Sequence, residues 1–143
     1  MDLSQRRLQP QWPHFFAWPR MGGMARGRSG CPCGLLARYE DCCGRFHKGE
    51  AAPTAESLMR SRYSAFAVGD AGYLLRTWHP ATRPTSLELE PSLRWVRLDV
   101  LEAAGRTVHF AAHYVDAGRP GVLEEHSRFI QDGDGWLYVG PVS

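Results

Sequence analysis

PTAESLMRSRYSAFAVGD, residues 53–70, predicts one amphipathic helix around which the remaining chain has to pack. Thr54 can cap its N-terminus, Glu56 lies in its first turn, and Gly69 ends it. The apolar residues recur at three- and four-residue steps and define one face: Ala55, Leu58, Met59, Tyr63, Ala65 and Phe66. The opposite face carries Glu56, Arg60 and Ser64, with Arg62 near the boundary. We therefore expect the apolar face to be buried and the polar face to be exposed.

The segments after this helix predict an antiparallel sheet. Asp70 can cap a shorter helix that continues to Trp78 and ends at His79-Pro80. From Pro91 onward the apolar period changes to two, which predicts strands near residues 93–101, 107–116, 122–131 and 136–139. Short glycine-containing turns separate consecutive strands, as in a meander. Helices followed by such a sheet predict an α+β fold, with the long helix across one sheet face.

All four cysteines precede the helix, as Cys31-Pro32-Cys33 and Cys42-Cys43. Four thiolates can close a tetrahedral shell around zinc with no open position for chemistry. Adjacent cysteines can face one ion only where the chain turns sharply or begins a helix, and Gly44 permits such a turn. Two disulfides are the alternative, but tandem cysteines have poor disulfide geometry and the chain shows no secretory signal. We therefore expect one structural zinc ion.

His47 lies just beyond the cysteines and has two possible roles. It could replace one thiolate as a ligand, or it could be an ordinary loop histidine. The sequence favours the loop histidine.

Alternation along the third predicted strand places a carboxylate among core residues. Leu123 and Phe129 share their face with Glu125 and Ser127. Burial of an unpaired charge is costly, so a partner is expected from Arg60, Arg62 or Arg128, the last disfavoured because it alternates to the opposite face. Glu125 is then either half of an ion pair between helix and sheet or a pocket acid or base. His79 is a second pocket candidate, at the open end of the sheet.

Composition and charge limit the classes of function. Residues 1–30 carry five arginines against Asp2, a net charge of +4, so the remaining chain carries −2, which argues against nucleic-acid binding. Residues 1–29 lack periodicity, and we expect a disordered N-terminal extension. No apolar run approaches the length of a membrane span and no signal peptide is evident, which predicts a cytoplasmic protein. Nucleophile and dinucleotide motifs are absent, so a non-enzymatic role is favoured over an enzyme.

Three segments together resemble the bacterial YchJ family of small proteins: CPCGLLARYEDCCGRFHKGEAAPTAESLMRSRYSAFAVGD (31–70), YLLRTWHP (73–80) and EEHSRFIQDGDGWLYV (124–139). The cysteine segment also resembles the SEC-C zinc motif at the tail of the SecA translocation ATPase. The resemblance implies zinc ligation by Cys31, Cys33, Cys42 and Cys43, and it supplies no catalytic residue. SEC-C motifs commonly continue with Ser-Gly-Lys after the first glycine, whereas Gly34 is followed here by Leu35-Leu36-Ala37.

The resemblance also implies how the chain is divided. Residues 1–29 form the extension, residues 30–48 the zinc-binding motif, and residues 49–143 a nuclear-transport-factor-2-like domain with the cystatin-like α+β cone, a curved antiparallel sheet packed on helices. By analogy with the SecA tail, the favoured function is a non-enzymatic module in which the zinc knob contacts a protein partner. The alternative is a small-molecule-binding protein, or an isomerase or hydrolase, that uses the cone pocket near Glu125.

Overall fold

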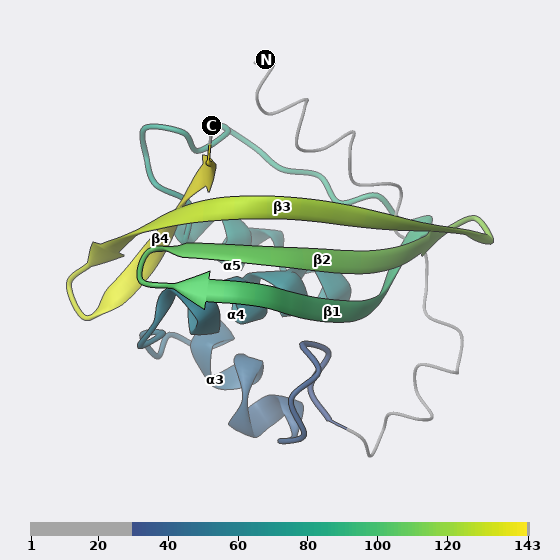
Figure 1. Cartoon of the computed structure of the whole chain (residues 1–143), viewed down its shortest axis with the longest axis horizontal. Helices are drawn as coiled ribbons and strands as arrows, with labels where there is room; N and C mark the ends of the chain where they lie inside the picture. The colour runs from purple at the N-terminus through teal and green to yellow at the C-terminus, as the bar shows by residue number, and fades with distance from the viewer. Residues whose placement is uncertain (1–29, 143) are drawn as a thin grey trace.

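A four-stranded antiparallel sheet lies over two helices in the computed structural model, which describes residues 30–142 (Figure 1). The predicted extension, residues 1–29, lies outside the described residues. The sheet order is β1-β2-β3-β4, so each strand pairs with the next along the chain. Its strands are β1 (Leu93–Ala104), β2 (Thr107–Asp116), β3 (Arg119–Asp132) and β4 (Gly135–Pro141). The α+β fold with an antiparallel meander is confirmed.

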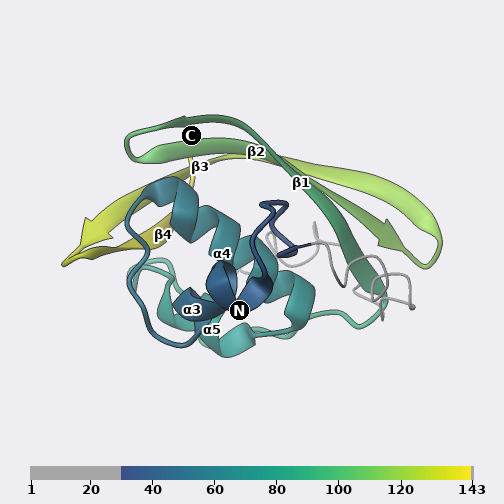
Figure 2. The same ribbon diagram turned by 90° about the horizontal axis from the view of Figure 1, so that it is seen from below.

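Helix α4 (Ala55–Val68) is the central element, and its predicted caps are confirmed. The Thr54 side chain accepts a hydrogen bond from the Ser57 backbone N–H, and Gly69 ends the helix at a φ of 84°, the left-handed region that favours glycine. The helix contacts all four strands and also α3 (Cys43–His47). It therefore lies between the sheet and the cysteine segment, as Figure 2 shows.

The polar face predicted for this helix is only partly exposed. Ser64 is 0% exposed and Arg62 is 6% exposed, whereas the sequence placed Ser64 on the outer face and Arg62 at the boundary. Ser64 is buried because the cysteine segment covers the side of α4 that faces away from the sheet. Arg62 is buried on the other side, between the rings of Trp78 and Tyr138. Periodicity within one helix predicts the face that packs against the sheet, and it does not show that another segment covers the opposite face.

The hairpin between β2 and β3 is tighter than the sequence predicts. Residues 117–121 were expected to form a loop, but only Ala117 and Gly118 do so, both with positive φ as a two-residue turn of this kind requires. Pro120 therefore lies within β3, on a stretch that β4 does not pair with. Gly121 pairs with Tyr114, whose ring occupies the space that a Cβ would need.

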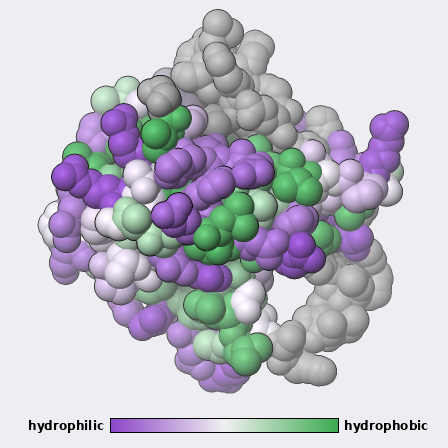
Figure 3. Space-filling model, viewed as in Figure 1, coloured by the Kyte–Doolittle hydropathy of each residue, from purple (hydrophilic) through white to green (hydrophobic). Residues whose placement is uncertain are grey.

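The sheet is curved and wraps around the helices (Figure 2). Strand β1 has two register shifts, between Trp95 and Arg97 and between Val100 and Glu102. Such irregularities bend a strand and increase its twist. The concave face meets α4, and the convex face is mostly hydrophilic with small apolar patches (Figure 3).

The short helix α5 (Ala71–Arg76) ends earlier than predicted. Asp70 caps it as expected, by accepting from the Tyr73 backbone N–H. Trp78 does not continue the helix, because it forms a parallel bridge with Tyr138 of β4. The His79 N–H donates to the Tyr138 carbonyl at 2.8 Å, which fixes this connection at the end of the sheet. In residues 30–142 no helix is both long and apolar enough to cross a membrane.

Candidate metal centre and ligand pocket

The four cysteine sulfurs gather at one point beneath α4. Their Sγ atoms all lie within 4.8 Å of one another, and the four residues are buried free cysteines. The Cys33 and Cys42 sulfurs are 3.7 Å apart. Four sulfurs around a zinc-sized cation, each at ~2.3 Å, would be separated by about 3.8 Å at tetrahedral angles. The cluster therefore has the size and the donor set of a closed tetrathiolate metal site.

Local backbone structure brings the two cysteine pairs together. The Cys31 N–H donates to the Ala37 carbonyl at 2.9 Å, which closes the first loop. A short 3-10 helix, η1 (Tyr39–Asp41), has Cys42 as its C-terminal cap, and α3 begins at Cys43. The two adjacent cysteines therefore belong to two different helical segments. The sequence predicted that Gly44 permits a sharp turn, but close packing requires it instead. It is helical, and a Cβ there would lie 2.7 Å from the Tyr39 carbonyl oxygen.

The four sulfurs lie so close together that hydrogen bonds between them shift the pKa values of the cysteines. A hydrogen bond to Cys31 is the main cause that raises the pKa of Cys33, to about 12. Hydrogen bonds from Cys33 and Cys43 lower the pKa of Cys31 well below its usual value. Coordination to a metal ion deprotonates such thiols and offsets their mutual repulsion.

His47 lies at the end of α3 and both of its ring nitrogens have partners. Its Nε2 lies 2.8 Å from the Ser61 carbonyl oxygen, which can only accept, so Nε2 carries the proton. Its Nδ1 then accepts from the Tyr39 hydroxyl at 2.6 Å. This arrangement leaves no nitrogen lone pair for a cation. His47 joins the cysteine segment to α4 and is neither a ligand nor a loop residue.

The cysteine segment forms the small knob predicted before the α+β domain, and its buried side chains join the main core. The four cysteines and Phe46 belong to the same cluster of buried side chains as the residues between α4 and the sheet. Arg60 donates from Nη1 to the Cys33 carbonyl at 2.9 Å, and Ser64 Oγ lies 3.5 Å from the Cys31 sulfur. Sequence reasoning missed both contacts, because they depend on the cysteine segment that covers α4.

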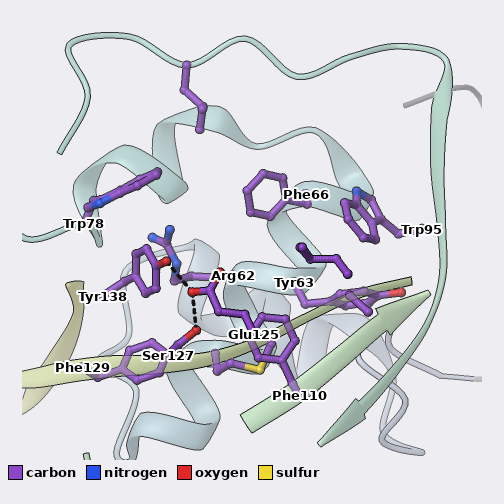
Figure 4. Close-up of a pocket in the computed structure, with 14 residues that line it drawn as sticks. Arg62, Tyr63, Phe66, Trp78, Trp95, Phe110, Glu125, Ser127, Phe129 and Tyr138 are labelled. Atoms are coloured by element: carbon purple, nitrogen blue, oxygen red, sulfur yellow. Dashed lines mark hydrogen bonds between the residues drawn. The ribbon is translucent and has the colours of Figure 1, made fainter. Parts of the chain in front are cut away.

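A pocket lies on the opposite side of α4, between this helix and the concave face of the sheet (Figure 4). Its empty volume is about 610 Å³, including the solvent at its mouth. Mainly apolar walls with a few polar groups are typical of small-molecule sites. Half of the lining residues are aromatic: Tyr63, Phe66, Trp78, Trp95, Phe110, Phe129 and Tyr138.

Glu125 lines this pocket, on the strand face that the sequence predicted. Its Oε2 accepts hydrogen bonds from the hydroxyls of Ser127 and Tyr138, each at 2.7 Å. Burial, and then the negative charge of Glu125, raise the pKa of Tyr138 well above its usual value, so Tyr138 remains a donor. No hydrogen bond to Oε1 is present within residues 30–142.

The ion pair expected for Glu125 is not present. Arg60 binds Glu56 at 3.0 Å on the other side of the helix, and Arg128 is exposed. Arg62 lines the same pocket without forming an ion pair to Glu125. Two hydroxyl donors supplied by the sheet satisfy the carboxylate instead. Ser127 lies two residues away on the same strand face, so this partner was visible in the sequence.

The Arg62 guanidinium lies between two aromatic rings. Its Cζ is 4.9 Å from the Trp78 ring centroid and 4.5 Å from that of Tyr138. Nη1 donates to the Leu74 carbonyl and to the Thr77 hydroxyl. Burial lowers the pKa of Arg62 to about 10, so its side chain remains charged at neutral pH. Stacking on aromatic faces and hydrogen bonds together stabilise this buried cation.

His79, the second predicted pocket residue, is not part of the pocket lining. Its Nδ1 accepts from the Ala81 backbone N–H at 3.0 Å, and its neighbour Trp78 lines the pocket instead. Two further histidines, His109 and His113, lie on the convex face and contact Glu124 and Asp99.

Comparisons with known proteins agree with this description. A family model described as "YchJ, middle NTF2-like domain" matches residues 54–141. A UPF0225 protein of Streptomyces coelicolor is 54% identical over 117 residues, which covers 76% of this chain and 91% of that protein. A UPF0225 protein of Bordetella pertussis is 48% identical over 122 residues, covering 78% and 90%.

Two solved structures have the same arrangement. A SEC-C motif containing protein from Rhodopseudomonas palustris superposes with a TM-score of 0.68 at 28% identity, over 80% of this chain and 98% of that chain. A SEC-C motif containing protein from Psychrobacter arcticus gives a TM-score of 0.64 at 26% identity, over 78% and 81%. Both similarities extend over the cone and beyond the segment that the family model matches.

Proposed function

Because this chain belongs to the YchJ family, whose middle domain contains the pocket, we propose that it is a small-molecule-binding protein with a structural metal ion. One observation carries the proposal. The carboxylate of Glu125 is held by two hydroxyls through Oε2, while Oε1 keeps its bonding capacity inside an aromatic pocket. A polar atom fixed in this way, among apolar walls, is typical of a group that orients a ligand.

The cysteine cluster supports the second half of the proposal. Four buried sulfurs within 4.8 Å of one another can fill all four positions around one ion, so the metal ion would serve structure and not catalysis. Thiolate ligands in this number favour zinc. Cys31, Cys33, Cys42 and Cys43 would hold it and so fix the segment that covers α4.

Binding is favoured over catalysis by the chemistry of the pocket lining. Among the described residues the lining includes no cysteine, lysine or histidine, and its titratable groups are Glu125, Arg62 and two tyrosines. Arg62 is already stacked and hydrogen bonded, and Tyr138 is bonded to Glu125. A single carboxylate that faces an apolar pocket can recognise a hydrogen bond donor without further chemistry.

The test is calorimetric titration with 2-naphthol, a flat apolar probe with one hydroxyl donor. Glu125→Gln keeps the shape of the side chain and is expected to weaken binding about tenfold or more, because a hydrogen bond to a charged group is lost. Glu124→Gln is the matched control, since the neighbouring carboxylate points to the convex face. Equal affinities for wild type and Glu125→Gln would contradict the role of Glu125, and absent binding to all three proteins would contradict the pocket.

A second candidate function, contact with a protein partner, rests on the loop between the first two cysteines and η1. Leu36 is 91% exposed and Leu35 is also exposed, at the positions where the SEC-C pattern carries small polar residues. An isolated leucine pair on a rigid loop could be the anchor of a small interface. The metal ion would then hold the shape of this loop.

Retention of proteins by immobilised variants tests the partner. We expect wild type to retain at least one specific protein and Leu36→Ser to lose it. Val122→Ser is the control, because Val122 is 53% exposed on the convex face, far from the cysteine loop in the chain. Identical retention by wild type and Leu36→Ser is the result that excludes this surface.

A further inference from the structure

Two opposite charges line the pocket without pairing to each other. Within the described part of the chain, Arg62 uses only Nη1 for hydrogen bonds, to Leu74 and Thr77. Glu125 uses only Oε2. The remaining guanidinium nitrogens and the second carboxylate oxygen are thus left with bonding capacity in the same cavity (Figure 4). Polar atoms that face a cavity in this way can bind water or a ligand.

The pair of charges restricts the charge of the ligand. An anionic ligand could pair with Arg62, but it would meet the carboxylate of Glu125 in the same cavity. A cationic ligand could pair with Glu125, but it would meet the guanidinium. Either ion would also have to lose its own hydration in a pocket with mainly apolar walls. A neutral ligand that offers one acceptor and one donor satisfies both groups.

The shape of the pocket adds a second restriction. Phe66, Trp78 and Trp95 surround the space above Glu125, as Figure 4 shows. The Trp78 ring already packs edge to face against Tyr138, with centroids 5.3 Å apart, which fixes its orientation. Aromatic walls favour flat rings, because stacked and edge-to-face contacts add to the apolar area that is buried.

We propose that the pocket takes a neutral, flat heteroaromatic ligand with a lactam edge, in which a carbonyl oxygen lies beside a ring N–H. The carbonyl oxygen accepts from the Arg62 guanidinium, and the ring N–H donates to Glu125 Oε1. Ser127 and Tyr138 position the carboxylate for this contact. The inference rests on the proposed function and specifies the class of ligand that the same pocket recognises.

Two isosteric probes test the inference on the unmodified protein. 2-Quinolone has the lactam edge, whereas coumarin has a ring oxygen in place of the N–H and is otherwise nearly the same shape. Calorimetric titration is expected to give about tenfold or more tighter binding for 2-quinolone, since coumarin leaves the carboxylate oxygen unpaired. In Glu125→Gln this preference is expected to fall to about threefold or less, because the acceptor loses its charge.

The outcomes separate the inference from the proposed function. Equal binding of the two probes, or tighter binding of coumarin, overturns the lactam inference and leaves a pocket that binds flat molecules. A preference for 2-quinolone that persists unchanged in Glu125→Gln overturns the assignment of its N–H to Glu125. Absence of binding by 2-quinolone, coumarin and 2-naphthol overturns both the inference and the proposed function.

Discussion

If the cysteines hold the proposed metal ion, its removal is expected to destabilise the whole chain and not the cysteine segment alone. The cysteines share one buried core with α4 and the sheet, so loss of the metal–sulfur bonds that hold the cysteine segment acts on the packing of α4 as well. Structural zinc contributes on the order of 10 kcal/mol of binding free energy in small domains, and we expect its loss to lower the free energy of unfolding by about 3 kcal/mol or more. The midpoint of thermal unfolding should fall by about 10 °C or more.

The measurement compares two probes during thermal unfolding, with and without a chelator under reducing conditions. Far-ultraviolet circular dichroism follows all elements, while tryptophan fluorescence, with Trp12 and Trp18 replaced by Phe, follows the pocket and the sheet through Trp78, Trp95 and Trp136. Both transitions should shift together. The double variant Cys42→Ser, Cys43→Ser should start at the lower midpoint and show no further response to the chelator. A fluorescence transition that stays in place while zinc is released would show that the cysteine segment is energetically separate.

Phe129→Ala is expected to be the most destabilising single substitution in the sheet that we consider. Phe129 is 2% exposed and packs against Tyr138, with ring centroids 5.7 Å apart. Truncation of a buried phenylalanine removes its contacts and leaves a cavity, which costs about 3–5 kcal/mol. Because Phe129 also lines the pocket, the cavity opens into it, and affinity for 2-naphthol should fall as well.

Ile130→Ala is the matched control for this substitution. Ile130 follows Phe129 on β3 but points to the convex face and is 39% exposed. Its truncation is expected to change the free energy of unfolding by about 0.5 kcal/mol. Chemical denaturation of both variants gives the comparison. Similar losses for Phe129→Ala and Ile130→Ala would mean that the concave face is not the main core.

Local signals in the sequence predicted the elements that depend on local interactions. The capping residue Thr54, the left-handed Gly69 and the apolar repeat between them were sufficient for α4, and strand alternation was sufficient to place Glu125 on the concave face. The end of α5 was not predictable in this way. Trp78 leaves the helix because it pairs with Tyr138, sixty residues later, and nothing near Trp78 in the sequence signals that partner.

In the candidate sites, too, the sequence predicted the features that depend on nearby residues and not those that depend on distant ones. The clustering of the cysteines in the sequence predicted that their sulfurs meet, since only a short spacer separates the two pairs. The environment of the cluster was not predicted, because Arg60 and Ser64 reach it from a helix that appeared to expose both. In the same way Arg62 appeared to be a boundary residue, and its place between two aromatic rings follows only from the position of β4.

Helix α4 connects the two sites, because its successive residues contact them from opposite sides. Arg60 and Ser64 meet the cysteine segment, while Met59, Arg62 and Tyr63 line the pocket. A rotation or shift of this single rigid element cannot change one set of contacts without changing the other. If a pocket ligand favours one position of α4, the same position sets the affinity of the cysteines for their ion, and thermodynamic linkage makes the effect equal in both directions. The occupancy of the metal site and the occupancy of the pocket would then affect each other.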